Sequence, residues 1–341
     1  MTIKIGINGF GRIGRNVLRA SLESKKVQVT AINDLGSTKN LAHLLKYDSL
    51  YGKFPEEVEY KNEDQIYVGG RGIKFFHQGE PEKIPWGKEG VDIVVESTGR
   101  FKTRPRLEGH LKGGARKVIL TTTGKDLDVT VVMGVNQEEY NPREHHFISN
   151  ASCTTNALAP LVKVLEEAFG IEKGLMVTIH AYTNDQKLLD LPHDDPRRSR
   201  AAGLSMIPTT TGAAQAVSLV FPQDLGEIDG LSIRVPTPTV SLIDFVALLK
   251  KNTSTDQVNE AFEKASREGL KDILGVSQEP LVSVDYRGSS YSTVVDTLST
   301  MVAGGNLVKV LSWYDNEWGY SQRTLDLTEY VAEKILDPAA V

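Results

Sequence analysis

A glycine-rich turn near the N-terminus constrains the fold of this chain more than any other feature. Residues Gly9-Phe10-Gly11-Arg12-Ile13-Gly14 match the pattern G-x-G-x-x-G, between a β-type run at 3–7 and a helical stretch that begins at residue 11. In such a turn the first glycine permits a tight bend, the second lets a pyrophosphate approach the backbone, and the third allows helix and strand to pack closely. The N–H groups at the helix start are then available to bind phosphate.

An acidic residue at a suitable distance supports this interpretation. Asp34 lies about twenty residues beyond Gly14, at the end of a second β-type run. Its carboxylate can accept hydrogen bonds from ribose hydroxyls, and it would repel a 2′-phosphate. We therefore predict a dinucleotide site that includes Gly9, Gly11, Gly14 and Asp34. The alternative is a tight strand–helix turn without a ligand.

The order of the β-type and helical runs predicts the fold class. In the first half, short apolar runs alternate with helical patterns, which is typical of a parallel sheet buried on both faces. After Asn150 the β-type runs are longer and alternate between apolar and polar residues, as in an antiparallel sheet with one face on a core. We predict an α/β fold: a Rossmann dinucleotide-binding domain plus an α+β catalytic domain with a mostly antiparallel sheet. The expected strands are 3–7, 27–32, 92–96, 117–120, 129–133, 146–148, 175–181, 231–235, 240–249, 281–285 and 307–313, with irregular strands over 53–76 and helices over 11–24, 38–47, 154–169 and 321–336.

Charge and cysteine content narrow the class of protein. The net charge is −5, and a nucleic-acid ligand usually requires a basic face, so we expect no nucleic acid as the main ligand. The single cysteine, Cys153, excludes an internal disulfide and favours a reducing compartment. No apolar run approaches the roughly 18 residues of a membrane helix. We therefore expect a soluble, cytoplasmic protein without a membrane partner.

Cys153 itself is a candidate nucleophile. It follows a β-type run and lies among small hydroxyl residues, Ser152, Thr154 and Thr155, at the start of a predicted helix. The helix N-terminus favours a thiolate and lowers the pKa of a thiol there. The alternative is an inert, buried cysteine, which is the common case for free cysteines.

A thiolate needs a base, and His180 is the histidine best placed for that role. It ends the run Met176-Val177-Thr178-Ile179-His180, directly before a long irregular polar segment, 184–200. A Cys–His pair would activate the sulfur and supply a general acid/base. The residues alone leave open an ordinary strand-end histidine. The pair His145-His146 is not expected to bind a metal, because adjacent strand residues face opposite ways and no further ligands complete a site.

Anion-binding candidates are present as well. Arg197-Arg198-Ser199-Arg200 and Arg234 carry guanidinium groups, whose planar fork suits phosphate. Thr209-Thr210-Thr211-Gly212 precedes a helix and is either an anion site or an N-cap. The arginine cluster could equally be a solvated loop or a subunit contact.

Five stretches, in their order along the chain, carry a family resemblance. They are Ile7-Asn8-Gly9-Phe10-Gly11-Arg12-Ile13-Gly14-Arg15, Ala151-Ser152-Cys153-Thr154-Thr155-Asn156, His180-Ala181-Tyr182-Thr183, Arg234-Val235-Pro236-Thr237 and Trp313-Tyr314-Asp315-Asn316-Glu317-Trp318-Gly319-Tyr320. On these, the chain resembles the phosphorylating glyceraldehyde-3-phosphate dehydrogenases over nearly its whole length.

The resemblance implies a reaction. Glyceraldehyde 3-phosphate would be oxidised and phosphorylated to 1,3-bisphosphoglycerate, with NAD as the cofactor and inorganic phosphate as the second substrate. Cys153 would be the nucleophile that forms a hemithioacetal and then a thioester, and His180 would be its base.

The resemblance also implies binding roles. Cofactor contacts would come from Arg12 and Ile13 at the pyrophosphate, Asp34 at the adenosine ribose and Asn316 at the nicotinamide carboxamide, with further contacts from Thr98, Gly99 and Thr121. Thr183, Arg198 and Arg234 would hold the phosphate of the substrate, whereas Ser152, Thr154, Thr211 and Gly212 would line the inorganic phosphate site.

It further implies an organisation into domains and subunits. The NAD-binding domain would span 1–151 and be completed by a C-terminal helix at 317–341, and the catalytic domain would span 152–316. An S-shaped loop at 184–206 would lie against the cofactor of a neighbouring subunit in a homotetramer.

The chain departs from the family pattern at two places. Ala157 stands where many members have a second cysteine, and Thr121-Thr122-Thr123 stands where many members have Ser-Ala-Pro. The second segment is expected to lie near the nicotinamide.

Two alternative functions are disfavoured. Erythrose-4-phosphate dehydrogenase is an alternative activity, disfavoured because Thr183 and Thr211-Gly212 are retained. A non-catalytic nucleotide-binding regulatory protein is disfavoured because Cys153 and His180 are retained. Leu191-Pro192 resembles the NAD-specific pattern of the family, which implies NAD. The small residues Gly36 and Ser37 after Asp34 leave room for some use of NADP.

Overall fold

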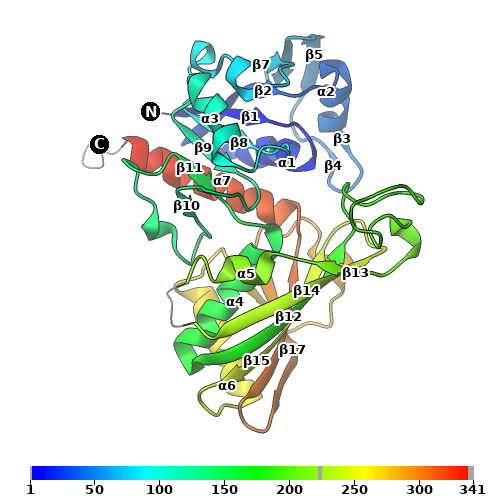
Figure 1. Cartoon of the computed structure of the whole chain (residues 1–341), viewed down its shortest axis with the longest axis vertical. Coiled ribbons are helices and arrows are strands. Elements are labelled where there is room, and N and C mark those ends of the chain that lie inside the picture. Colours follow the sequence, from blue (N-terminus) through cyan, green and yellow to red (C-terminus); the bar gives the residue numbers. More distant parts are fainter. Residues whose placement is uncertain (1, 222–224, 337–341) are drawn as a thin grey trace. The chain divides into compact units, whose positions relative to one another are not determined.

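Two compact units make up the chain. The computed structural model describes residues 2–221 and 225–336. Within these, the first unit comprises 2–131, 137–151 and 321–336, and the second unit comprises 132–136, 152–221 and 225–320. The expected C-terminal helix is α7, Trp318–Leu336, coloured red in Figure 1, and its residues from 321 onward belong to the first unit. Residues 337–341 of that expected segment lie outside the described residues.

A largely parallel sheet forms the centre of the first unit. Its strand order is β10-β11-β9-β8-β1-β2-β7-β6-β5, and every pair from β10 to β7 is parallel. The strands β8 and β9 are buried along their whole length, so the prediction of a parallel sheet covered on both faces is confirmed. The region 53–76 provides an antiparallel edge, β5 to β7. The strands are β1 Ile3–Asn8, β2 Val27–Asn33, β3 Tyr47–Asp48, β4 Gly52–Lys53, β5 Val58–Asn62, β6 Gln65–Val68, β7 Arg71–Phe76, β8 Ile93–Glu96, β9 Lys117–Leu120, β10 Val129–Thr130 and β11 Phe147–Ser149, and the helices are α1 Arg12–Ala20, α2 Thr38–Lys46 and α3 Arg104–Lys112, with short 3₁₀ turns η1 Ser21–Glu23, η2 Pro81–Lys83, η3 Trp86–Glu89 and η4 Gln137–Glu139.

The predicted glycine turn joins β1 to α1. Gly9 has a φ of +91°, in the region that favours glycine. A Cβ on Gly14 would lie 2.2 Å from the carbonyl oxygen of Gly9, so helix and turn are packed too closely for any side chain at Gly14. At Gly11, the N-cap of α1, a Cβ would meet nothing within 4 Å. The backbone is therefore open to an incoming group at Gly11 and closed at Gly14.

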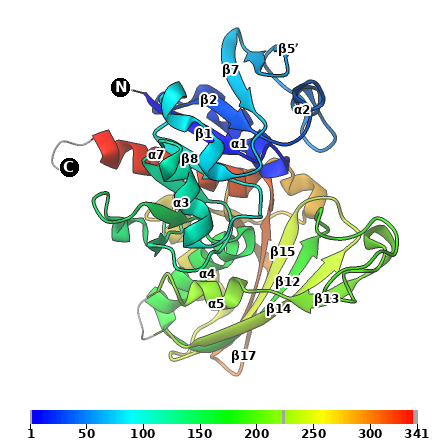
Figure 2. The ribbon, with the colours of Figure 1, turned by 45° about the horizontal axis from the view of Figure 1, so that its top comes forward.

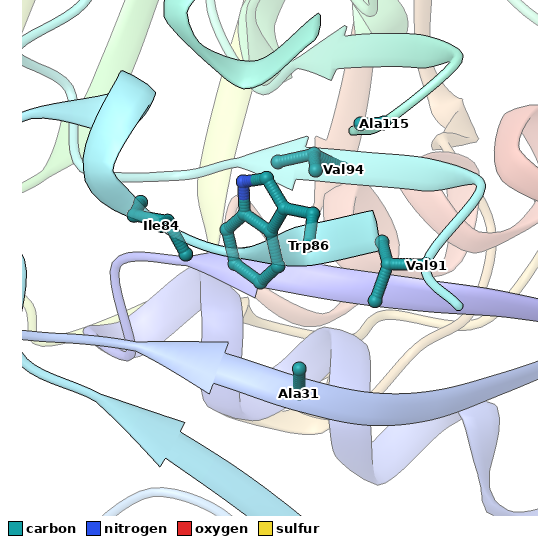
Figure 3. Close-up of a cluster of buried hydrophobic side chains, with 6 residues drawn as sticks. All are labelled: Ala31, Ile84, Trp86, Val91, Val94 and Ala115. Atoms are coloured by element: carbon teal, nitrogen blue, oxygen red, sulfur yellow. The ribbon is translucent and has the colours of Figure 1, made fainter. Parts of the chain in front are cut away.

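Trp86 organises a buried cluster on one face of this sheet. Its side chain is fully buried and packs with Ala31, Ile84, Val91, Val94 and Ala115. Figure 3 shows the indole ring lying among these side chains. An indole N–H inside a core needs an acceptor, and that of Trp86 donates to Nδ1 of His110 at 3.0 Å.

A second sheet forms the core of the second unit. Its order is β13-β14-β12-β15-β18-β17-β16, and most neighbouring pairs are antiparallel, which confirms the predicted mostly antiparallel sheet. β12 pairs with β14, and β16 with β17, in parallel. Figure 2 shows β12, β14 and β15 running side by side. The strands are β12 Ile171–Ala181, β13 Ile207–Thr210, β14 Glu227–Val235, β15 Ser241–Leu249, β16 Leu274–Ser277, β17 Thr293–Ala303 and β18 Leu307–Tyr314, and the helices are α4 Cys153–Phe169, α5 Ala213–Val217 and α6 Thr255–Arg267, with 3₁₀ turns η5 Ala202–Leu204 and η6 Ser283–Tyr286.

Two of the expected strands are wrong or too long. Residues 281–285 do not form a strand: the Asp285 carboxylate accepts the N–H of Val282 at 2.8 Å and turns the chain into η6. The expected strand at 129–133 ends after Thr130, and the side-chain oxygen of Asn136 accepts the N–H of Val132 just beyond it. In both places a local side-chain acceptor competes with strand pairing.

No helix within residues 2–221 and 225–336 is long and apolar enough to cross a membrane.

Alanine substitutions at Gly14 and Gly11 should affect stability differently, because only Gly14 is closely packed. We expect Gly14→Ala to destabilise the protein by about 2 kcal/mol, because the new methyl group overlaps the backbone at Gly9. The matched control is Gly11→Ala, which meets no atoms and should cost less than about 1 kcal/mol as a poorer N-cap. Urea unfolding followed by fluorescence measures both, and equal stability of the two variants would contradict this account.

Candidate active site

Cys153 is the first residue of α4. Ser152 is the N-cap of this helix, and its side-chain oxygen accepts the N–H of Thr155 at 3.0 Å. The cysteine is partly buried, and its Sγ lies 3.5 Å from Nε2 of His180. The structure thus brings together the two residues that the sequence analysis proposed as nucleophile and base.

His180 is placed by the parallel pairing of β12 with β14. In this register His180 lies directly beside Arg234, and one guanidinium nitrogen of Arg234 is 2.9 Å from the imidazole Nδ1. Nδ1 is also 2.7 Å from the carbonyl oxygen of Ala181, which can only accept a hydrogen bond. The guanidinium can only donate, so these two contacts require opposite roles of Nδ1. We assign the proton to Nδ1, because the carbonyl is the shorter contact and also accepts the N–H of Arg234 at 3.2 Å. This tautomer leaves the lone pair on Nε2 directed at the thiol.

Burial and the guanidinium together set the protonation of the pair. Burial, and then the positive charge of Arg234, lower the pKa of His180 to about 3, so the imidazole is neutral at pH 7 and able to accept a proton. Burial raises the pKa of the Cys153 thiol, and the charge of Arg234 and the N–H groups at the helix start act in the opposite direction. The expected thiolate-stabilising groups are present, but the lowered thiol pKa that they predicted is outweighed by burial.

Tyr314, at the end of β18, was not among the predicted site residues. Its hydroxyl lies 2.9 Å from the hydroxyl of Thr154 and 2.8 Å from that of Thr178, and its ring meets His180 edge to face. It thereby ties the start of α4 to β12 beside the thiol. The stretch that carries Tyr314 was already part of the resemblance, but nothing in the sequence shows which side chains a strand-end hydroxyl reaches.

Arg198 lies in a dense polar network. Its guanidinium contacts the carboxylate of Asp185 at 2.7 Å and donates from Nε to the Thr209 hydroxyl at 2.9 Å. Asp195 accepts from the same Thr209 hydroxyl at 2.6 Å. These two aspartates were not predicted from the sequence, and an incoming anion would have to compete with them for Arg198.

The other candidate anion residues lie at two places on this sheet. Thr183 and Arg234 lie at the ends of β12 and β14, whereas Thr211 and Gly212 follow β13, whose last residue, Thr210, pairs with Leu231. Thr183 follows β12, and its N–H donates to the Gln186 side chain at 3.4 Å. The hydroxyl of Thr211 accepts the N–H of Ala213, and Gly212 is the N-cap of α5. Arg234 is partly buried, and its buried Nε has no hydrogen-bond partner among the described residues. A buried, unsatisfied guanidinium N–H is suited to an anionic ligand.

Asn316 is fixed at this end of the second sheet. Its side-chain oxygen accepts the hydroxyl of Ser241 at 2.9 Å, and that Ser241 oxygen accepts the N–H of Ala181 at 3.1 Å. The amide is buried, so its orientation is set by the strand ends that also carry His180.

The glycine turn and Asp34 line a pocket in the first unit. The pocket has a volume of about 260 Å³, and its wall includes Gly9, Gly11, Asp34 and Thr98. Asp34 accepts the N–H of Phe10 at 2.7 Å through one oxygen and that of Gly36 at 2.8 Å through the other. Leu35 and Phe101 add apolar surface to the wall. The remaining lining residues are Asn8, Asn33, Gln78, Gly79, Ser97 and Arg100.

Four further cofactor candidates do not line this pocket. Arg12, the first residue of α1, forms an ion pair with Asp48, and Ile13 follows it in the first turn. Gly99 has a φ of +69°, and the hydroxyl of Thr121 donates to the carbonyl of Glu96 at 3.1 Å. None of Arg12, Ile13, Gly99 and Thr121 is among the residues that line the pocket.

These groups fit a dinucleotide. A glycine open to approach at a helix start, a carboxylate within hydrogen-bond reach of the same turn and an adjoining pocket form the donor and acceptor set that pyrophosphate and ribose require. Across residues 2–221 and 225–336, no group of three or more histidine, cysteine, aspartate or glutamate side chains could hold a metal ion.

Comparison with known proteins gives a consistent result along the chain. The family model described as glyceraldehyde 3-phosphate dehydrogenase, NAD binding domain, matches residues 3–104, and that described as glyceraldehyde 3-phosphate dehydrogenase, C-terminal domain, matches residues 152–316. The chain is 56% identical to a glyceraldehyde-3-phosphate dehydrogenase of Geobacillus stearothermophilus over 334 residues, which are 98% of this chain and 99% of the relative. It is 52% identical to glyceraldehyde-3-phosphate dehydrogenase 2 of Bacillus subtilis (strain 168) over 341 residues, which are the whole of both chains.

Removal of the Tyr314 hydroxyl should reveal its role in holding the site. We expect Tyr314→Phe to lower the free energy of unfolding by about 1–3 kcal/mol, because it leaves the buried hydroxyls of Thr154 and Thr178 without this partner. Tyr140→Phe is the matched control: Tyr140 is also buried, but its hydroxyl has no hydrogen-bond partner among the described residues, so its loss should be neutral or slightly stabilising. Thermal and urea unfolding measure both variants. A Tyr314→Phe protein with the same free energy of unfolding as the wild type would contradict this role of Tyr314.

Proposed function

Since the chain belongs to the glyceraldehyde-3-phosphate dehydrogenase family, we propose that it oxidises and phosphorylates D-glyceraldehyde 3-phosphate to 1,3-bisphosphoglycerate, with reduction of NAD. The observation that carries the proposal is the contact of 3.5 Å between Sγ of Cys153 and a neutral His180, beside the partly buried guanidinium of Arg234. A nucleophile, a base and a cation for a phosphorylated substrate are thereby held together on rigid strand and helix ends.

The first step is addition of the thiol to the aldehyde. Nε2 of His180 takes the proton of Cys153 as the sulfur bonds to the aldehyde carbon, and it returns that proton to the oxygen, which gives a hemithioacetal. The N–H groups at the start of α4 are suited to stabilise the oxygen as its charge develops.

The second step converts the hemithioacetal to a thioester. NAD, when bound, supplies the acceptor for the hydride that leaves the carbon. His180 takes the hydroxyl proton at the same time, so the carbonyl forms again. Gly9, Gly11 and Asp34, with Arg12, Ile13, Gly14, Thr98, Gly99, Thr121 and Asn316, would hold the cofactor. The carboxylate of Asp34 disfavours a 2′-phosphate, so NADP is the poorer cofactor.

The last step releases the product. An inorganic phosphate oxygen attacks the thioester carbon, the bond to sulfur breaks, and the Cys153 thiolate leaves. The thiolate takes back the proton that His180 holds, which restores the thiol and the neutral base. Thr183, Arg198 and Arg234 would bind the phosphate of the substrate, and Ser152, Thr154, Thr211 and Gly212 would bind the attacking phosphate. A thioester is reactive enough for phosphate to attack it, whereas an oxygen ester would be too unreactive.

Binding of the anionic substrate would also strengthen the base. Arg234 and Arg198 both lower the pKa of His180 through their charge. A phosphate dianion on these guanidinium groups offsets that charge and raises the pKa of His180 from about 3 toward its ordinary range. Proton acceptance from the thiol is then favoured when the correct substrate is present.

Turnover in the presence and absence of phosphate tests this function. Reduction of NAD, followed by absorbance, should require both glyceraldehyde 3-phosphate and inorganic phosphate, and His180→Asn should lower kcat by about 10²–10⁴-fold. Multiple turnover without phosphate would contradict the mechanism. A higher kcat/KM with erythrose 4-phosphate would favour the alternative activity, and a higher kcat/KM with NADP would contradict the cofactor assignment.

We also propose a cytoplasmic homotetramer, with the segment 184–206 at a subunit contact. Large apolar side chains are strongly exposed there: Leu188 is 86% exposed, Leu204 83% and Met206 75%. Exposed apolar groups of this size in one segment are typical of a surface that another chain covers. A reduced nucleophilic cysteine suits a reducing compartment.

Sedimentation of a charged variant tests the assembly. Wild-type protein at micromolar concentration should sediment as a tetramer, and Leu188→Asp with Leu189→Asp should yield smaller species, because it places two carboxylates in an apolar contact. Leu219→Asp is the matched control, since Leu219 is 64% exposed outside the segment and should leave the assembly intact. A monomeric wild-type protein would refute the proposal.

A further inference from the structure

A buried carboxylate lies directly behind the pocket in the first unit. Glu96 is the last residue of β8 and is fully buried, yet it is not among the residues that line the pocket. Its side chain takes no part in the mechanism above. A buried carboxylate is costly unless hydrogen-bond donors surround it.

The side-chain carboxylate of Glu96 accepts four hydrogen bonds, two on each oxygen. One oxygen accepts the N–H of Thr98 at 2.8 Å and the Thr98 hydroxyl at 2.5 Å. The other accepts the amide of Asn8 at 2.5 Å and Nε2 of His110 at 3.0 Å. Thr98 and Asn8 are both pocket-lining residues, so this one carboxylate holds two parts of the wall.

The chain of bonds continues along the ends of three parallel strands. Asn33, Asn8 and Glu96 are neighbours in the registers of β2, β1 and β8. Because a carboxylate can only accept, the amide nitrogen of Asn8 must face Glu96, and its oxygen must face Asn33. Asn33 therefore donates to Asn8 at 2.8 Å, and its own oxygen accepts the N–H of Gln78 at 2.8 Å. Gln78 also lines the pocket.

The other side of Glu96 is held by the core. The indole N–H of Trp86 can only donate, and it donates to Nδ1 of His110 at 3.0 Å. The proton of His110 is therefore on Nε2, which points at Glu96. Both His110 and Trp86 are fully buried, and Figure 3 shows the ring of Trp86 fixed within its apolar cluster. The core thus fixes the tautomer of a histidine that in turn fixes the carboxylate.

We propose that Glu96 is the positioning residue of the dinucleotide pocket: its acceptor-only carboxylate, oriented by Trp86 and His110, sets the direction of the hydrogen-bonding groups of Thr98, Asn8, Asn33 and Gln78 that face the cofactor. The inference rests on the proposed function for the identity of the ligand in this pocket. Glu96 itself does not line the pocket, so it would act on the cofactor only through these neighbouring residues.

Replacement by glutamine cannot preserve this arrangement. An amide NH₂ in place of either oxygen faces two donors, those of Thr98 on one side or those of Asn8 and His110 on the other. If Asn8 and Asn33 both turn over to compensate, the amide of Asn33 meets the N–H of Gln78, which cannot turn. At least one donor–donor contact remains in every case, at a cost of the order of a buried unsatisfied group.

The experiment measures NAD binding by titration calorimetry and KM for NAD in Glu96→Gln, Glu96→Asp and wild type. We expect Glu96→Gln to raise both the Kd and the KM for NAD by about 10–100-fold, and the change to appear in KM rather than in kcat. Glu96→Asp, which keeps an acceptor-only group, should recover part of the affinity. The rate of Cys153 alkylation by iodoacetamide should be the same in all three, since Cys153 belongs to the second unit.

Trp86→Phe provides a second test that keeps an aromatic ring in the core. It removes the donor to His110, so the imidazole is free to change tautomer, and the Kd for NAD should rise by about 2–10-fold. Unaltered NAD affinity in Glu96→Gln, or in Trp86→Phe if Glu96→Gln does not fold, would overturn the inference. Equal losses in Glu96→Gln and Glu96→Asp together with faster alkylation would also overturn it, because they indicate general loosening. Failure of the wild type to bind NAD would instead refute the proposed function.

Discussion

Parallel pairing of neighbouring strands is the constraint on which both polar sites of this protein depend. In a parallel pair, residues at the same register present their side chains to the same face and end at the same edge of the sheet. The pairing of β12 with β14 places His180 beside Arg234, and the pairing of β2, β1 and β8 places Asn33, Asn8 and Glu96 in one row. Polar groups that are far apart in sequence therefore meet without any flexible segment between them.

Burial of these strand ends determines the protonation state of each group. At His180, burial and a neighbouring guanidinium act in the same direction, so the imidazole is neutral and serves as a base. At Cys153 they act in opposite directions, and the thiol keeps its proton until the base takes it. The same guanidinium thus favours the charged form of the nucleophile, favours the neutral form of the base and offers an unsatisfied N–H to an anion. One residue links substrate binding to the start of the reaction.

Local patterns in the sequence were sufficient for the parts of the fold that depend on local physics. The glycine turn and the alternation of strands and helices in the first half could be stated from spacing and residue type. The pairing of Cys153 with His180 followed from the resemblance, because the residues alone left an ordinary strand-end histidine open. The strand expected at 281–285 could not be corrected in this way, because the acceptor that turns the chain, Asp285, is polar in the manner of any strand residue on an exposed face. Tyr314 and Asp185 were missed for a different reason: their contacts depend on register and on loop packing, which join residues 136 and 13 positions apart.

The two buried histidines show why such contacts escape sequence reasoning and yet determine function. His110 and His180 are both almost completely buried, and in each the side-chain tautomer follows from a neighbour that can only donate or only accept. At His110 the indole of Trp86 requires a lone pair on Nδ1, so the proton points at Glu96. At His180 the carbonyl of Ala181 requires a proton on Nδ1, so the lone pair points at Cys153. The same residue type is thus a donor behind one pocket and an acceptor beside the thiol. The difference is the carbonyl oxygen of Ala181, which lies 2.7 Å from Nδ1 of His180 and also accepts the N–H of Arg234.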